Sequence, residues 1–177
     1  MSGDIDIFVI DEVGAGRLAT SAHPAAAGDP AVRIEAVAAA GFQQVVSLLE
    51  PAEADSLGLE SEPGLVEAEG MTFISFPIAD FSEPDSLPAF ADLAQRLYRD
   101  LQSGRSTLVH CRGGVGRSGL LAVAVLIQGG MSVQDAKSLV THKRGKPSPE
   151  TGRQSRWLET NATRLVTRLG RNTGTSI

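Results

Sequence analysis

Apolar residues along the chain follow two spacings, and segments of the two kinds alternate. Short apolar runs bounded by glycine, proline or charged residues predict strands, and apolar residues three or four positions apart predict helices. The predicted strands are residues 4–11, 42–50, 71–78 and 105–110, the predicted helices are residues 30–40, 88–104, 119–128, 132–144 and 148–170, and residues 52–64 are predicted as a loop or short helix. Strands alternating with helices predict an α/β fold with a mostly parallel central sheet flanked by helices and right-handed crossovers.

Particular residues indicate where these helices begin and how they pack. Asp85 or Ser86 can cap the helix over residues 88–104, and Asp85 is interpreted as a cap rather than as a general acid. Ser132 begins a pattern that resembles a capping box, and Pro149 is expected in the first turn of the last helix. The helix over residues 119–128 is apolar on every face, which predicts a central, buried position.

Length and composition limit the class of protein. The 177 residues are 42% hydrophobic, which favours one globular domain over residues 1–170 with a disordered tail at 171–177. A net charge of −5 argues against a nucleic-acid or anionic-membrane partner. No signal peptide is evident at the N-terminus, no apolar run is long enough to span a bilayer, and one cysteine permits no internal disulfide. A cytoplasmic location is therefore expected.

That single cysteine, Cys111, lies between a predicted strand and the glycine-rich segment "RGGVGRSG". A strand that ends in glycines before a helix can turn its backbone N–H groups inward as an anion-binding nest, and the helix dipole adds positive potential. Arg117 offers two parallel donors that suit a phosphate. The loop contains no lysine and so is not a nucleotide-binding Walker loop, and no His/Cys/Asp cluster has metal-ligand spacing. Neither a metal nor another cofactor is expected.

The same nest should favour a thiolate, because a thiolate and a phosphate are both anions. Ser118 can add a hydroxyl hydrogen bond to the sulfur. A thiolate beneath a bound phosphate can attack phosphorus and form a cysteinyl-phosphate intermediate. A lone cysteine is more often a small core residue, but the combined pattern His-Cys-x-x-Gly-x-Gly-Arg-Ser-Gly after a strand and before a helix outweighs that interpretation.

These residues resemble the signature Cys-x-x-x-x-x-Arg-Ser/Thr of the cysteine-based protein phosphatases. The order of elements is similar to the dual-specificity branch, and "PIAD" ahead of the signature resembles its kinase-associated type. The resemblance implies a protein tyrosine phosphatase-like fold and a phosphorylated protein substrate, with phosphotyrosine and also phosphoserine and phosphothreonine hydrolysed. It assigns Cys111 as nucleophile and Arg117 as phosphate clamp. The remaining phosphate-binding positions that it implies are Arg112, Gly113, Gly114, Val115 and Gly116.

The resemblance also implies supporting residues. A general acid is needed to protonate the leaving oxygen, and Asp80 lies at the expected distance before the cysteine. Gln154 resembles a glutamine that orients water in some relatives, although a surface helix glutamine is the commoner interpretation. His110 is expected to order the loop and tune the thiol, which is close to the role of an ordinary hydrogen-bonded core histidine.

Alternatives of other classes stay open. A pseudophosphatase that binds phosphate without turnover is one, although such proteins usually lack the cysteine or the acid. A rhodanese-like sulfurtransferase typically has four residues between cysteine and arginine, whereas this chain has five, and in low-molecular-weight phosphatases the cysteine loop lies near the N-terminus. The basic residues Lys143, Arg144 and Lys146 are interpreted as an exposed helix terminus, where cations are favoured anyway.

Overall fold

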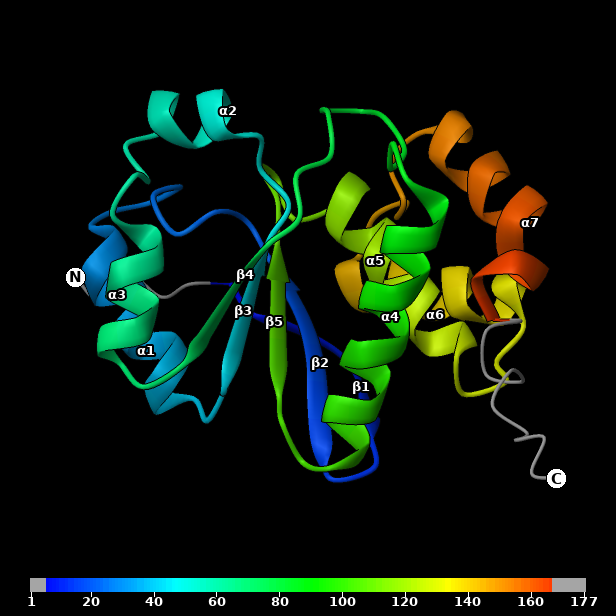
Figure 1. The fold of residues 1–177 in the computed structure, drawn as a ribbon, viewed down its shortest axis with the longest axis horizontal. Helices are drawn as coiled ribbons and strands as arrows, with labels where there is room; N and C mark the ends of the chain where they lie inside the picture. The colour runs from blue at the N-terminus through cyan, green and yellow to red at the C-terminus, as the bar shows by residue number, and fades with distance from the viewer. Residues whose placement is uncertain (1–5, 167–177) are drawn as a thin grey trace, which may run out of the picture.

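A computed structural model describes residues 6–166 as a five-stranded sheet with helices on both faces (Figure 1). The strands are β1 (Phe8–Val13), β2 (Gly16–Ser21), β3 (Gln44–Ser47), β4 (Thr72–Ser75) and β5 (Thr107–His110). The helices are α1 (Pro30–Ala39), α2 (Pro51–Ser56), α3 (Glu62–Ala68), α4 (Leu87–Gln102), α5 (Gly116–Ile127), α6 (Val133–Arg144) and α7 (Gly152–Val166). The order in the sheet is β1-β2-β5-β3-β4, and all neighbours except β1 and β2 run parallel. The predicted mostly parallel α/β fold is confirmed.

The sheet separates two apolar cores. Between the sheet and helices α4 to α7 lies the larger core, and α5 is buried along its whole length, as its uniformly apolar sequence predicts. Beneath α1 and α3 lies a smaller core, in which Ile34 and Val37 pack with Val45 and Leu108. Burial on both faces explains why β3 and β5 are apolar at consecutive positions rather than at alternate ones.

Strand β2 was absent from the sequence prediction. Its residues "GRLATS" include only two apolar side chains, Leu18 and Ala19, so they give little strand signal. The strand is fixed by tertiary structure: it pairs antiparallel with β1 through a turn at Gly14 and parallel with β5 on its other side. Gly14 has φ +60°, and a Cβ there would lie 2.7 Å from the Cα of Gln102, so the turn requires glycine.

Several predicted boundaries need correction. Ser86, not Asp85, is the N-cap of α4, with its hydroxyl accepting a hydrogen bond from the Ala89 N–H. Helix α5 begins at Gly116 rather than at residue 119, and α7 begins at Gly152, so Pro149 precedes it. Residues 52–64, predicted as a loop or short helix, contain most of α2 and the start of α3.

Other predictions about the whole chain have different outcomes. The single domain over residues 1–170 stays a prediction, and the predicted tail at 171–177 lies outside the described residues. None of the helices within residues 6–166 combines the length and the apolar character that crossing a membrane requires.

Candidate active site

The loop from Cys111 to Val115 joins the end of the central strand β5 to the start of α5. Because β2, β5, β3 and β4 are parallel, the loops that follow them meet at one edge of the sheet, where ligands of open α/β sheets bind. Gly114 has φ +68°, and a Cβ there would lie 2.2 Å from the Ser21 carbonyl oxygen after β2. Only glycine therefore lets this loop turn against its neighbouring strand.

The loop leads directly into the first turn of α5. The Gly119 N–H donates to the Val115 carbonyl at 3.2 Å, and the N–H groups before Gly119 precede the helical ladder of α5. The Ser148 hydroxyl donates to the same Val115 carbonyl at 2.6 Å and holds the loop from below. Arg112 and Gly113 are exposed, whereas Gly114, Val115 and Gly116 are buried. The loop therefore ends at the N-terminus of a buried helix, where the helix dipole favours an anion.

Cys111 is only 3% exposed, and its Sγ lies 3.5 Å from the Ser118 Oγ. Ser118 is fully buried in the first turn of α5, so its hydroxyl is held near the sulfur by the helix itself. The two groups that the sequence places seven residues apart are therefore brought into contact.

Arg117 is the largest fully buried side chain of this region, and its guanidinium is held by a carboxylate that the sequence did not reveal. Glu53 of α2 accepts two hydrogen bonds from Arg117, at 2.7 Å from Nη1 and 2.9 Å from Nη2. The Ile78 carbonyl accepts a third at 3.0 Å. The Arg117 hydrogen bonds lower the pKa of Glu53 despite partial burial. Burial opposes the charge of Arg117, but Glu53 and the neighbouring anionic groups outweigh it and raise the Arg117 pKa.

Asp80, in the loop between β4 and α4, contacts the same guanidinium and shares its Nη2 with Glu53. Its Oδ1 is 3.0 Å from the Arg117 Nη2, and its side chain is 41% exposed. The next residue, Phe81, has φ +57°, an uncommon conformation for a residue with a large side chain, and its N–H donates to the Asp80 Oδ1 at 3.0 Å. The backbone around Asp80 is therefore tightly specified at a position open to solvent.

His110 and Gln154 support the loop from two sides. The His110 Nε2 lies 2.7 Å from the Glu62 Oε1, and both side chains are almost fully buried. Gln154 is fully buried, its Nε2 donates to the Ser82 carbonyl at 2.9 Å, and a Cβ on Gly116 would lie 3.2 Å from its Oε1. The surface interpretation of Gln154 is therefore wrong. This glutamine packs between the loop of Asp80 and the start of α5.

Comparison with known proteins identifies the family. The model of the dual specificity phosphatase catalytic domain matches residues 38–162, more than half of the chain and all of the site. The chain belongs to the dual specificity phosphatase family. The resemblance drawn from the signature sequence is confirmed.

Relatives and solved structures agree with this family. Cyclin-dependent kinase inhibitor 3 of Sus scrofa is 28% identical over 137 residues, which are 76% of this phosphatase chain and 64% of the relative. The chain thus spans somewhat less than two thirds of that curated relative. A crystal structure of kinase associated phosphatase, with its catalytic-site cysteine changed to serine, has a TM-score of 0.82 at 22% identity and covers 94% of this chain and 97% of its own. Tk-PTP in its active form has a TM-score of 0.73 at 31% identity, covering 92% and 97%.

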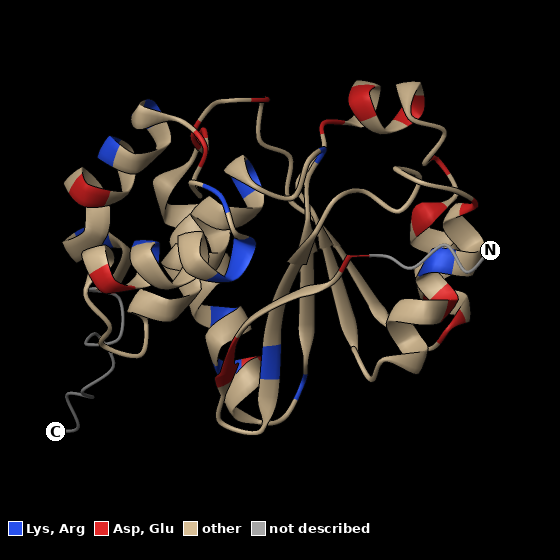
Figure 2. Cartoon of the chain, turned by 180° about the vertical axis from the view of Figure 1, so that it is seen from behind, with Lys and Arg blue, Asp and Glu red and all other residues tan. Residues whose placement is uncertain are grey.

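Two carboxylates of this phosphatase domain were missed by sequence reasoning. Glu53 and Glu62 lie in α2 and α3, in the segment that reads as a polar loop. Seven acidic residues and no basic ones fall between positions 50 and 69, so neither glutamate stands out by composition. Figure 2 shows this acidic concentration on α2 and α3. Only the topology points to Glu53. Helix α2 follows β3, and the end of β3 lies beside the end of β5, which leads into the Cys111 loop.

The described residues contain no group of three or more His, Cys, Asp or Glu side chains placed to hold a metal ion. Asp85, the other aspartate of the Asp80 loop, is exposed. Arg144 differs from the expected exposed helix terminus, because its side chain is buried, whereas Lys143 and Lys146 are exposed as expected.

Proposed function

We propose that this chain is a protein phosphatase that hydrolyses phosphotyrosine, and also phosphoserine and phosphothreonine, through a cysteinyl-phosphate intermediate on Cys111. One cluster of contacts carries the proposal. In it the buried guanidinium of Arg117, directly after the Cys111 loop, binds both Glu53 and Asp80. The similar kinase associated phosphatase has a catalytic-site cysteine by its description, and Cys111 is the one cysteine of this chain. No metal or other cofactor takes part in the proposed reaction.

In the first step the Cys111 thiolate attacks phosphorus. The S–P bond forms as the bond from phosphorus to the substrate oxygen breaks, and that oxygen takes a proton from the Asp80 carboxyl group. The N–H groups of Arg112 to Gly116 and the Arg117 guanidinium stabilise the equatorial oxygens, where negative charge is concentrated. Glu53 fixes the guanidinium by accepting a hydrogen bond from each of its two terminal nitrogens.

Asp80 changes partner when substrate binds. Without substrate its carboxylate is paired with Arg117, with Oδ1 3.0 Å from Nη2. A phosphate dianion that binds Arg117 replaces this contact. The backbone at Phe81 holds Asp80 in place during this change.

In the second step water attacks the phosphorus of the cysteinyl phosphate. The S–P bond breaks, the sulfur leaves as the thiolate, and the ionised Asp80 accepts the water proton. Gln154 supports this step, because its amide lies between the Asp80 loop and the start of α5. Its Nε2 donates a hydrogen bond to the Ser82 carbonyl, and its Oε1 faces Gly116. His110, held by Glu62, supports the backbone that carries the nucleophile.

The decisive experiment is hydrolysis of para-nitrophenyl phosphate in EDTA by the wild type and by Cys111→Ser. Turnover by the wild type and none by the variant is the expected result. Turnover that survives in Cys111→Ser would refute the thiolate mechanism. If neither turns over but both bind vanadate, the chain is a phosphate-binding module. Thiosulfate sulfur transfer then tests the sulfurtransferase alternative.

A further inference from the structure

The loop that carries Asp80 is joined to α7 by two neighbouring residues of that helix. The Gln154 Nε2 donates to the Ser82 carbonyl at 2.9 Å. One residue earlier, the Arg153 Nη2 donates to the Glu83 Oε1 at 2.6 Å, and the Arg153 Nε lies 2.5 Å from the Glu83 Oε2. Both carboxylate oxygens of Glu83 therefore face one guanidinium, which comes from a residue 70 positions away in the chain.

The Glu83–Arg153 ion pair lies at the surface of the domain. The Arg153 side chain is 64% exposed and the Glu83 side chain is 22% exposed. The hydrogen bond from Arg153 lowers the pKa of Glu83, so the carboxylate is ionised at neutral pH. An exposed ion pair contributes little to the stability of a whole domain, and salt weakens it. Its effect is therefore expected on the position of the loop rather than on the stability of the fold.

The loop needs these contacts with α7 most when a phosphate is bound. Residues 79–85 contact α5 and α7 through polar groups: Asp80 with Arg117, Ser82 with Gln154 and Glu83 with Arg153. In the proposed mechanism the phosphate takes Arg117, so the contact with α5 is lost just before the acid has to act. The two contacts with α7 do not involve the phosphate site and can persist through this exchange.

We propose that Glu83 and Arg153 are positioning residues for the general acid, and that their ion pair holds the Asp80 loop against α7 while phosphate occupies Arg117. The proposal rests on the proposed function, in which Asp80 protonates the leaving oxygen. A proton donor must stay within hydrogen-bond reach of the atom that it protonates, and a small displacement of a catalytic group slows a reaction steeply. Glu83 follows Asp80 by three residues, so movement at one is transmitted to the other through a short stretch of backbone.

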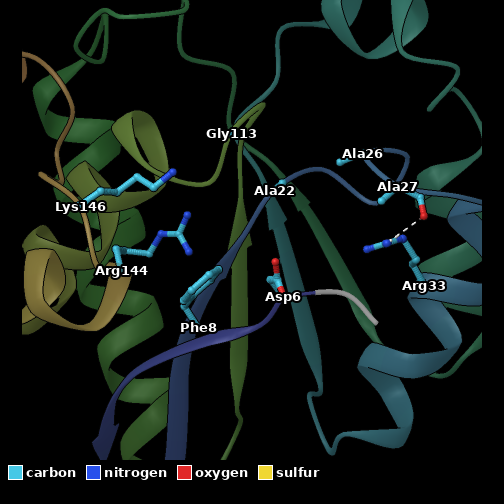
Figure 3. Close-up of a pocket in the computed structure, with 9 residues that line it drawn as sticks. All are labelled: Asp6, Phe8, Ala22, Ala26, Ala27, Arg33, Gly113, Arg144 and Lys146. Atoms are coloured by element: carbon cyan, nitrogen blue, oxygen red, sulfur yellow. Dashed lines mark hydrogen bonds between the residues drawn. The ribbon is translucent and has the colours of Figure 1, made fainter. Parts of the chain in front are cut away.

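The ion pair between the Asp80 loop and α7 lies apart from the cations beside the Cys111 loop. A pocket of about 250 Å³ opens beside Gly113, and Arg144 and Lys146 reach into it (Figure 3). None of the described residues that line this pocket belongs to the Asp80 loop or to α7. Substitutions in the ion pair therefore leave these cations in place. The affinity for vanadate, which reports the phosphate site alone, should stay within about twofold of the wild-type value.

The test compares two aryl phosphates that differ in their need for an acid. Phenyl phosphate releases a phenol like that of tyrosine, with a pKa of about 10, whereas the leaving group of 2,4-dinitrophenyl phosphate departs without a proton. The value of kcat/KM covers the steps up to the cysteinyl phosphate, in which Asp80 is the acid. Glu83→Gln should lower it about tenfold for phenyl phosphate, part of the roughly 10²–10⁴ that an acid supplies, and less than about twofold for the dinitrophenyl ester. An equal loss for both esters would show a merely structural role and overturn the proposal.

Matched variants show whether the effect belongs to the ion pair. Arg153→Gln should change the ratio of the two kcat/KM values as Glu83→Gln does. Asp85→Asn in the same loop and Arg156→Gln in the same helix, both at exposed positions, should leave the ratio unchanged. In chains that carry Asp80→Asn, Glu83→Gln should cause no further loss, because the acid is already absent. A ratio that falls equally in the two controls, or a further loss in the Asp80→Asn chain, would contradict the proposal.

Salt provides a second measurement on the same two esters. At about 1 M sodium chloride the Debye length is only about 3 Å, so an exposed ion pair is strongly screened. The ratio of kcat/KM for phenyl phosphate to that for the dinitrophenyl ester should fall with salt in the wild type and stay constant in Glu83→Gln. Because the ratio cancels the effect of salt on phosphate binding, an equal decline in both chains would count against the ion pair.

Hydrogen exchange in the full chain carrying Cys111→Ser tests the ion pair without turnover. The Ser82 N–H donates to the Ala79 carbonyl at 3.0 Å, so its exchange reports opening of the loop. With inorganic phosphate bound, this N–H should exchange several-fold faster when Glu83→Gln is added than when Asp85→Asn is added, and equal rates would overturn the proposal. A wild type without turnover would refute the proposed catalysis and leave this comparison intact. Normal turnover with an unchanged ester ratio in Glu83→Gln would refute only the role of the ion pair.

Discussion

Glu53→Gln tests whether the Glu53–Arg117 pair maintains the phosphate site. The substitution keeps the size of the side chain and one acceptor oxygen but removes the negative charge. Arg117 is 1% exposed and Glu53 is 11% exposed, so the change leaves a buried cation without its main partner. Removing one partner of a buried ion pair costs about 3–5 kcal/mol. Because Arg117 keeps the Ile78 carbonyl and Asp80, and glutamine keeps one acceptor, we expect a loss of about 2–3 kcal/mol.

Urea unfolding of the full chain measures this loss. A domain of ordinary stability, about 5–15 kcal/mol, remains folded after it. Glu60→Gln is the matched control, because Glu60 is exposed four residues beyond the end of the helix that carries Glu53. A change within about 0.5 kcal/mol of that control would show that the pair does not stabilise the site. Activity toward para-nitrophenyl phosphate should fall by at least about tenfold, since the guanidinium is no longer fixed.

The same pair predicts an acid limb of stability. The pKa of Glu53 is lower in the folded chain than its ordinary value of about 4.3. Between the two values the unfolded chain binds more protons, so stability rises with pH. The contribution of Glu53 is complete above the ordinary value and is lost as pH falls through the lowered one. Glu53→Gln should therefore show a flatter decline in stability on acidification than the wild type or Glu60→Gln.

Three further predictions address the loop and the acid. Asp80→Asn should lower kcat for phosphate esters with poor leaving groups by roughly 10²–10⁴, and Asp85→Asn should not; the reverse result would reassign the acid. Gly114→Ala should destabilise the fold in urea by about 2 kcal/mol or more, because a Cβ there would meet the Ser21 carbonyl at 2.2 Å, whereas Gly113→Ala meets no atom within 4 Å and serves as its control. Equal stabilities would contradict the close approach. Brief peroxide treatment should inactivate the enzyme in a way that added dithiothreitol reverses, as expected of a thiolate oxidised to sulfenic acid, and phosphate bound during treatment should protect it.

Much of the site could be predicted from sequence because its central part is local. Cys111, Arg117 and Ser118 are within one loop and one helical turn, where spacing along the chain fixes spacing in space. Their family follows from that local pattern, and the match over residues 38–162 confirms it. The α/β class was equally accessible, since apolar runs at strand and helix spacing depend on the backbone period alone.

Tertiary structure decided the rest. The buried positions of Glu53, Glu62 and Arg144 have no sequence signal, because burial of a charge depends on surroundings that only the fold supplies. Strand β2, too, is a strand because β1 and β5 provide hydrogen-bond partners on both sides. The sequence by itself determined the family, the candidate nucleophile with its loop, and the class of fold. The three-dimensional arrangement alone determined which carboxylate holds Arg117, because that contact joins residues that lie far apart in the chain.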